Sequence, residues 1–251
     1  MTFPVYSYVL TCSPTAARLG AFRASWERAA VGEFGSGREF SVVWGMNSER
    51  FPRSPFWRTG SNRTELPDRE RGNGFDRRGH TACYWGHVQE WRQALGEHDA
   101  EFSTAAAAFF EDDCELDPDF WERAEMAFRE LPPEWEILYF GGQLCVNGRP
   151  KPPIFSENLY KADNVNRTHA YAVKISALPK IILWFEENHE WGHNFRDPKT
   201  GASEAEVDYA LGHLTEIGFL NGFALRRWAC GQAAGFSWTQ GRNESARRWQ
   251  L

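Results

Sequence analysis

Three adjacent acids, Glu111, Asp112 and Asp113, are the residues of this sequence best suited to chemistry. They directly follow residues 105–110, a short and uniformly apolar run that is typical of a buried central strand. Ligands bind at the carboxyl ends of strands in open α/β sheets. Neighbouring carboxylates repel one another, and a hard cation such as Mg²⁺ or Mn²⁺ relieves that repulsion while it binds phosphate oxygens. The triplet therefore predicts a metal and diphosphate site, against the simpler interpretation of an acidic start to the next helix.

A second group of residues offers a different metal chemistry. Residues 189–193 read His-Glu-Trp-Gly-His, which fits the H-E-x-x-H pattern of zinc hydrolases. In that pattern two histidines one helical turn apart bind Zn²⁺ and the glutamate activates water. Gly192 weakens the helix that must present both histidines, and Pro198 limits its extension. A zinc metallohydrolase using His189, Glu190 and His193 is thus the alternative function, and a helix end beside an acceptor is the plainer interpretation.

The elements around the triplet alternate between strand and helix patterns. Residues 5–10 are β-branched and aromatic, and Leu19, Phe22 and Trp26 then recur at helical spacing. We expect further strands at 40–44, 105–110, 137–140, 169–173 and 223–228, and helices at 81–95, 117–128, 176–188 and 203–214. This alternation predicts an α/β fold with a mostly parallel central sheet covered by helices on both faces. The length of 251 residues suits a single domain over residues 1–251.

A polar arm over residues 46–79 interrupts this alternation. It contains eight arginines, with proline and glycine between them. Loops of this length without secondary structure are functional or disordered. Two interpretations stay open, a solvated loop and a lid that brings positive charge to an anionic substrate.

Composition limits the class of protein. A hydrophobic share of 42% and an aromatic share of 15% describe a globular chain, and a net charge of −6 argues against a nucleic-acid binder. The first residues lack the pattern of a signal peptide, and no run of about 18 apolar residues occurs. We expect a cytoplasmic protein with at most peripheral membrane contact. Five cysteines without C-x-x-C spacing predict free thiols rather than a disulfide framework.

An ordered series of motifs runs through most of the chain. A strand and an arginine-bearing turn lie at residues 8–18, and residues 79–91 form a segment rich in small residues with Cys83 and His87. The acidic triplet follows, then Trp-Glu-Ile-Leu-Tyr-Phe-Gly-Gly at 135–142. The later motifs are Thr-His-Ala-Tyr-Ala-Val at 168–173, Val-Asp at 207–208, Gly-Gln at 231–232 and Phe-Ser at 236–237. This series resembles glycosyltransferase family 25, the lipopolysaccharide and procollagen galactosyltransferase type.

The resemblance implies a GT-A fold, a Rossmann-like nucleotide-diphospho-sugar transferase with Mn²⁺ or Mg²⁺ as cofactor. It implies an inverting transfer of a hexose from a nucleotide-sugar, most often UDP-galactose or UDP-glucose, to a glycan or glycolipid acceptor. By the same resemblance Asp113 contacts the metal, Asp112 the ribose, and Glu111 acts through water. The further donor contacts that it implies are Thr11, Arg18, His87, Gln232 and Ser237, and the acceptor contacts are Gly141, Gly142 and His169.

An inverting transfer needs a general base for the acceptor hydroxyl. Asp208 is the candidate, with Glu206 next, although Asp208 is equally well interpreted as a surface acid on an amphipathic helix. For His87 and His169 the alternative is a structural histidine. Two other functions fit the same acids, a catalytically dead sugar- or nucleotide-binding relative and a nucleotidyltransferase.

Overall fold

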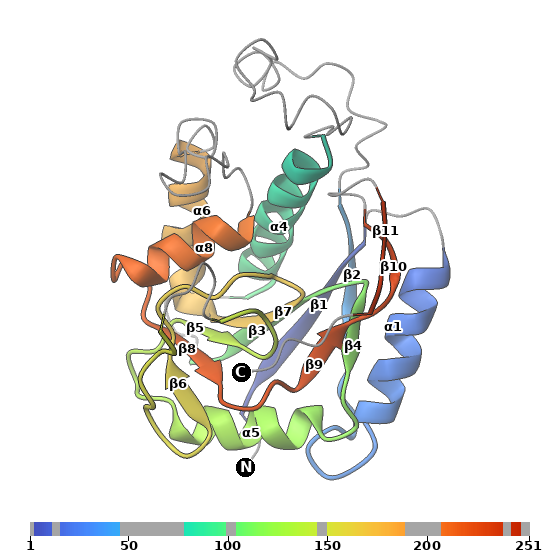
Figure 1. Cartoon of the computed structure of the whole chain (residues 1–251), viewed down its shortest axis with the longest axis horizontal. Helices are drawn as coiled ribbons and strands as arrows, with labels where there is room; N and C mark the ends of the chain where they lie inside the picture. The colour runs from blue at the N-terminus through green and yellow to red at the C-terminus, as the bar shows by residue number, and fades with distance from the viewer. Residues whose placement is uncertain are drawn as a thin grey trace.

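A seven-stranded sheet forms the centre of the molecule in the computed structural model, which describes residues 3–11, 16–45, 78–98, 104–144, 150–188, 207–237 and 242–246 (Figure 1). The strand order is β2-β1-β3-β7-β5-β8-β6. The strands are β1 (Val5–Thr11), β2 (Ser41–Trp44), β3 (Ala106–Glu111), β5 (Ile137–Tyr139), β6 (Leu159–Lys161), β7 (Ala170–Lys174) and β8 (Gly222–Leu225).

The sheet is mixed, with most strands running one way. β1 pairs in parallel with both β2 and β3, and β5 pairs in parallel with β8. β7 lies antiparallel between β3 and β5, and β6 is antiparallel to β8 at the edge. Five of the seven strands therefore share a direction, which confirms the prediction of an α/β fold with a mostly parallel sheet. A strand was predicted at residues 169–173, but its antiparallel direction between β3 and β5 was not.

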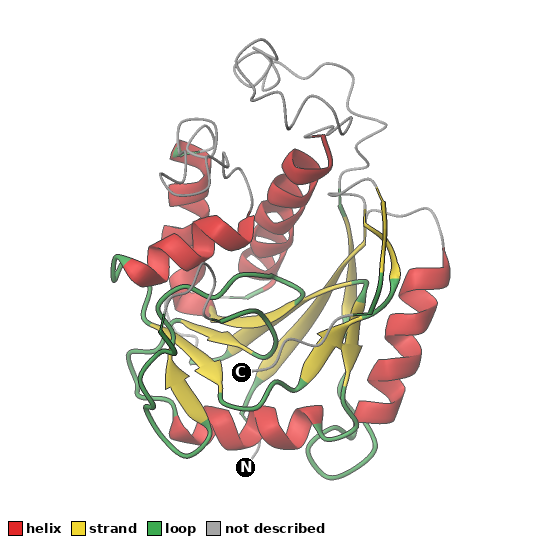
Figure 2. Ribbon diagram, in the orientation of Figure 1, coloured by secondary structure: helices red, strands yellow, loops and turns green. Residues whose placement is uncertain are grey.

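Helices cover both faces of the sheet, as predicted (Figure 2). The helices α1 (Ala16–Ala29) and α5 (Phe120–Glu130) lie on one face, and α4 (Arg78–Glu97), α6 (Leu178–Glu187) and α8 (Val207–Glu216) lie on the other. The alternation of side chains along β3 explains this arrangement. Phe110 packs against Phe22 and Trp26 of α1, whereas Phe109 packs against Tyr171, which accepts a hydrogen bond from Trp91 of α4.

Most of the elements that the sequence predicted are present in the structure. The expected strands before residue 174 and the helices at 81–95 and 117–128 are confirmed with small shifts of their ends. The helix expected at 176–188 is α6, preceded by a short 3-10 helix, and the start of the one expected at 203–214 lies outside the described residues.

The strand expected at residues 223–228 is present as β8, but it is shorter than expected and is not the last strand. β8 ends at Leu225, and β9 (Cys230–Gln232), β10 (Gly235–Ser237) and β11 (Arg242–Glu244) follow it. β4 (Cys114–Leu116), which pairs antiparallel with β9, and β6 were also missed. Strands of three residues are too short to carry a recognisable alternation of apolar and polar positions, and β5 was identified only because its residues are all apolar.

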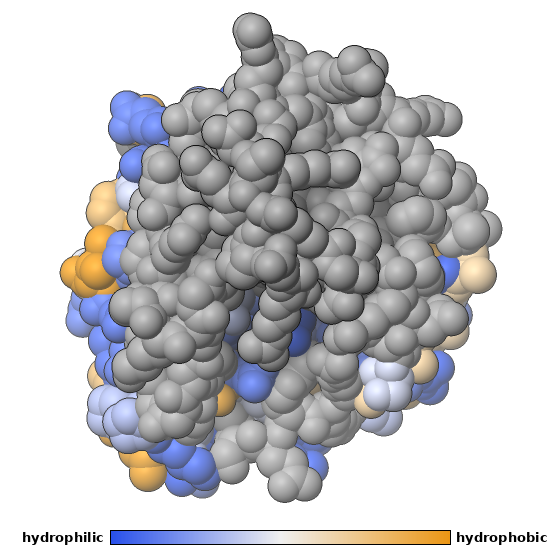
Figure 3. All heavy atoms as spheres, turned by 45° about the horizontal axis from the view of Figure 1, so that its top comes forward, coloured by the Kyte–Doolittle hydropathy of each residue, from blue (hydrophilic) through white to orange (hydrophobic). Residues whose placement is uncertain are grey.

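Polar side chains cover most of the described surface that is visible in the space-filling view, and apolar ones gather near its edge (Figure 3). The core is continuous, with fully buried rings such as Trp91, Trp121 and Phe140. Among the described helices, none has the length and apolar character to cross a membrane.

Candidate functional site

The acidic triplet lies where two parallel strands of the sheet end. Glu111 is the last residue of β3, beside Leu10 of β1 in the strand register. The Asp112 N–H donates to the Leu10 carbonyl, and the Ala233 N–H donates to the Asp113 carbonyl. The three acids therefore lie between the carboxyl ends of β1 and β3 and the β4–β9 ribbon. Their predicted position at a strand end is confirmed.

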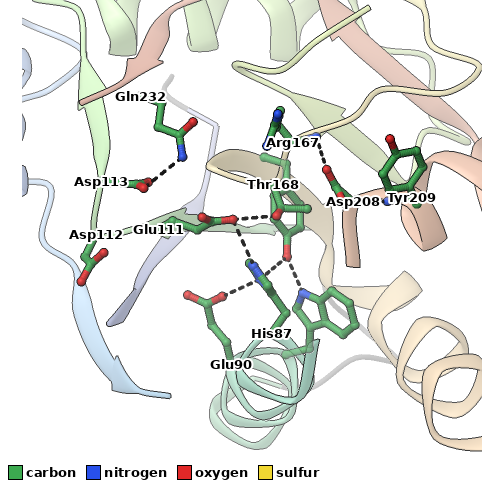
Figure 4. Close-up of polar contacts among 12 residues, drawn as sticks. His87, Glu90, Glu111, Asp112, Asp113, Arg167, Thr168, Asp208, Tyr209 and Gln232 are labelled. Carbon is green, nitrogen blue, oxygen red and sulfur yellow. Dashed lines mark hydrogen bonds and ion pairs between the residues drawn. The ribbon is translucent and has the colours of Figure 1, made fainter. Parts of the chain in front are cut away.

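Arg18 of α1 joins two of these acids. Its Nη2 atom lies 3.0 Å from Oδ1 of Asp112 and 2.6 Å from Oδ2 of Asp113. The Thr11 hydroxyl donates to Oδ2 of Asp112 at 2.7 Å, and the Gln232 amide donates to Oδ2 of Asp113 at 3.0 Å. Three residues predicted as donor contacts, Thr11, Arg18 and Gln232, thus converge on the two aspartates; Figure 4 shows the contact from Gln232.

One oxygen of Asp113 differs from the other in its contacts. Its Oδ1 atom is buried and has no hydrogen-bond partner among the described residues. Burial and the neighbouring charge of Glu111 raise the pKa of Asp113 to about 6, against the opposing effect of Arg18. A buried acceptor without a partner is costly, and a divalent cation is one group that would satisfy it. Asp113 therefore fits the role of metal ligand that the resemblance implies, and this role stays a prediction.

Glu111 points away from the aspartates, toward the helix α4 (Figure 4). Its Oε1 atom accepts a hydrogen bond from the Thr168 hydroxyl at 2.6 Å and lies 3.5 Å from Nε2 of His87. Burial by itself would raise the pKa of Glu111, but the hydrogen bond and charge of His87, together with Thr168, outweigh it and lower the pKa to about 2. Glu111 is therefore held as a carboxylate.

His87 is completely buried beneath Glu111. Its Nδ1 atom lies 3.0 Å from the Tyr171 hydroxyl and 3.4 Å from Oε2 of Glu90. Glu90 is also fully buried, and burial raises its pKa to about 7 against the opposing effect of His87. A direct contact between His87 and a donor stays a prediction. In the structure the His87 ring contacts Glu111, which lies between it and the two aspartates (Figure 4).

A second group of metal-ligating atoms includes Glu111. The ligand atoms of Cys83, His87 and Glu111 all lie within 4.8 Å of one another, so these residues could hold a metal ion. The sequence-based predictions concerned the cysteines only as free thiols without C-x-x-C spacing, so this group was not predicted. The available signal was the spacing of four residues between Cys83 and His87, which places both side chains on one face of a helix.

Asp208 is buried, with a relative exposure of 8%, so its interpretation as a surface acid is wrong. Its Oδ2 atom accepts the Arg167 N–H and its Oδ1 atom accepts the Tyr209 N–H, both at 2.9 Å (Figure 4). Arg167 has a φ of 79°, in the left-handed region of backbone conformation that residues other than glycine rarely adopt. Asp208 therefore steadies a strained residue just before Thr168, and its role as a base stays a prediction.

The two predicted acceptor glycines occupy tightly packed positions. A Cβ atom on Gly141 would lie 2.5 Å from Sγ of Cys230 and 2.6 Å from Nε2 of His169, and one on Gly142 would lie 2.6 Å from Cγ1 of Val165. His169 itself is 2% exposed. The structure thus explains why glycine stands at both positions, and their contacts with an acceptor remain predictions.

Several predicted features lie outside the described residues. These are Glu206, the His-Glu-Trp-Gly-His segment at 189–193 and the arm up to residue 77. Ser237 is described as part of β10, without its side chain. The described cysteines Cys83, Cys114 and Cys230 are free thiols, in agreement with their predicted state.

Comparisons with known proteins leave the site without a family assignment. No family model matches the chain, and no curated protein matches its sequence. Among solved structures, the chain is similar to the crystal structure of A197 from STIV. The sequence identity is 9%, the match covers 99% of this chain and 97% of that chain, and the TM-score is 0.41. A likeness at this score supports no argument about function.

Proposed function

We propose that the chain is an inverting, metal-dependent glycosyltransferase of the GT-A type, similar to glycosyltransferase family 25. It would move a hexose from UDP-galactose or UDP-glucose to a glycan or glycolipid. One observation carries the proposal: Asp113 has a buried oxygen without a hydrogen-bond partner among the described residues, beside the cationic Arg18, at the carboxyl end of β3. Carboxylates and a positive charge at a strand end suit a diphosphate bound with a cation.

The donor half of the site would be organised by Thr11, Arg18, Asp112 and Asp113. Thr11 and Arg18 fix the Asp112 carboxylate from two sides, so that it can accept a ribose hydroxyl. Arg18 places positive charge where the phosphates of the donor would lie. Asp113 would present Oδ1 to Mn²⁺ or Mg²⁺, and a bound ion would supply Lewis-acid stabilisation of the leaving diphosphate.

The acceptor half would depend on Asp208 as the base, with Glu206 as the second candidate. The two backbone N–H donors hold the Asp208 carboxylate in one orientation. A carboxylate oxygen has more than one acceptor position, so a held carboxylate can still take the proton of a hydroxyl. Arg167, which donates to Asp208, is followed by Thr168, which donates to Glu111, so one short segment connects the base to the triplet.

Titration calorimetry of the full chain with UDP, with and without Mn²⁺, tests the donor site. We expect UDP binding to require Mn²⁺. In Asp113→Asn the affinity for UDP should fall by about tenfold or more, because a ligand of the ion is lost. Glu115→Gln is the matched control, since Glu115 lies two residues further along and points outward from β4. Normal UDP binding and turnover by Asp113→Asn would exclude the proposal.

A panel of nucleotide-sugars then separates the remaining functions. Release of UDP from one donor, with transfer to a glycan, supports the glycosyltransferase. Nucleotide binding without donor hydrolysis indicates the catalytically dead relative, and release of pyrophosphate from a nucleoside triphosphate indicates the nucleotidyltransferase. Each of these last two results would contradict the proposed reaction.

A further inference from the structure

Cys83 and His87 form one side of a metal-ligating group in which the proposed transfer reaction places no metal ion. They lie one turn apart on α4, and both face Glu111 at the end of β3. The Nε2 atom of His87 is 3.5 Å from Oε1 of Glu111. Two ligands of a tetrahedral zinc ion, each about 2.0–2.2 Å from the metal, lie about 3.4 Å apart. The imidazole and the carboxylate are therefore already separated as zinc ligands are.

The surroundings of His87 prepare its Nε2 atom for a metal. Tyr171 and Glu90 contact Nδ1 from inside the core, and Trp91 in turn donates to the Tyr171 hydroxyl at 2.8 Å. Contacts at Nδ1 orient the ring, as around metal-bound histidines in general, and a metal at Nε2 would displace the proton that the ion pair with Glu111 holds there. The buried Nε2 atom faces Oε1 of Glu111 at 3.5 Å, a distance at the limit of a hydrogen bond.

The types of ligand select the metal. A thiolate, an imidazole and a carboxylate together suit Zn²⁺, whereas Mg²⁺ and Mn²⁺ prefer oxygen ligands such as those of Asp113. Thr168 restrains Glu111 through a hydrogen bond at 2.6 Å, which fixes the third ligand. The side chain of Glu111 is 24% exposed, whereas that of His87 is wholly buried, so the group opens at the triplet and not toward the core.

We propose that Cys83, His87 and Glu111 bind Zn²⁺ through three protein ligands, with a fourth position open to water or to an oxygen of a bound substrate. Three protein ligands with one open position are the arrangement of zinc ions that take part in chemistry. The site is separate from the oxygen of Asp113 and does not require that the chain transfers a sugar. The competing arrangement is an ion pair of His87 with Glu111 that never takes up a metal.

Cobalt substitution tests the site, because Co²⁺ reports both its ligands and its geometry. The probe is Co²⁺ added to metal-free full-length protein. We expect one equivalent to bind, with a thiolate-to-cobalt charge-transfer band in the near ultraviolet and intense visible bands of tetrahedral geometry. One equivalent of Zn²⁺ should abolish both. Cys83→Ser should lose the charge-transfer band, and Cys145→Ser, which leaves all three ligands in place, should keep it.

The results that overturn the proposal are equally definite. Absence of Co²⁺ and Zn²⁺ binding by the folded wild type, or an unchanged charge-transfer band in Cys83→Ser, would exclude the site. Circular dichroism checks that each variant is folded, and Cys83→Ala provides a second substitution if serine disturbs the helix. Asp113→Asn should keep the cobalt spectrum while it loses Mn²⁺-dependent UDP binding. Failure of the zinc site and failure of the proposed transfer reaction therefore give different results.

Discussion

Arg18 contacts Asp113 directly, with Nη2 2.6 Å from Oδ2, and the same nitrogen reaches Asp112 at 3.0 Å. The two aspartates follow β3 and the arginine belongs to α1, so this contact joins segments that are far apart in the sequence. One guanidinium thus offsets two largely buried carboxylates. Its removal leaves those charges without compensation, which is costly in a desolvated site.

We therefore expect Arg18→Ala to weaken both the fold and the site. The free energy of unfolding should fall by about 1–3 kcal/mol, because buried carboxylates lose a charged partner. Urea denaturation measures this change. Arg92→Ala is the control, since Arg92 forms an exposed ion pair with Glu186 and should cost less than about 1 kcal/mol. An equal loss in both variants would contradict the importance assigned to the Arg18 contact.

Glu90 should make stability depend on pH. Burial raises its pKa from 4.5 to about 7 in the folded protein, so the native state binds more protons than the unfolded state between these values. This contribution to stability is fully present below pH 4.5 and is lost as the pH rises through 7. Glu90→Gln removes the titration.

The measurement for Glu90 is thermal unfolding of the wild type and Glu90→Gln at pH 5 and pH 8. The variant should gain stability relative to the wild type between pH 5 and pH 8. A difference between the two proteins that is the same at both pH values would show that Glu90 does not titrate in this range.

Gly141 should tolerate no side chain. A Cβ atom there would lie 2.5 Å from Sγ of Cys230 and 2.6 Å from Nε2 of His169, so Gly141→Ala should destabilise the fold by about 1–3 kcal/mol through overpacking. Gly96→Ala is the matched control, because nothing lies within 4 Å of that position and alanine favours the helix by about 1 kcal/mol. Chemical denaturation should give shifts of opposite sign, and a neutral Gly141→Ala would contradict the packing that the structure describes.

A substitution of Asp208 should lower turnover without weakening the binding of the donor. If Asp208 is the base, Asp208→Asn lowers the rate of transfer by about 10²–10⁴-fold, since the amide cannot take the hydroxyl proton. UDP affinity should stay near that of the wild type. Glu216→Gln, an acid exchanged on the same helix, should keep full activity. A purely structural Asp208 would instead lower the unfolding temperature and leave the rate per folded molecule unchanged.

Local patterns in the sequence were sufficient for the principal elements. The apolar run before Glu111 identified a buried strand and placed the acids at its end. The spacing of Phe22 and Trp26 identified α1, because a helix places every third or fourth residue on one face. Periodicity and burial are properties of a few neighbouring residues, so they can be read along a single chain.

The tertiary structure alone decided which distant residues meet. The order of strands and helices brings Arg18 to Asp113, and it brings Cys83 and His87 of α4 to Glu111. No local pattern encodes these contacts, since each depends on how strands and helices pack around one core. The sequence by itself determined that carboxylates gather at a strand end. Their partners, an arginine on one side and a thiol with an imidazole on the other, follow from packing, because only the folded chain brings these groups close together.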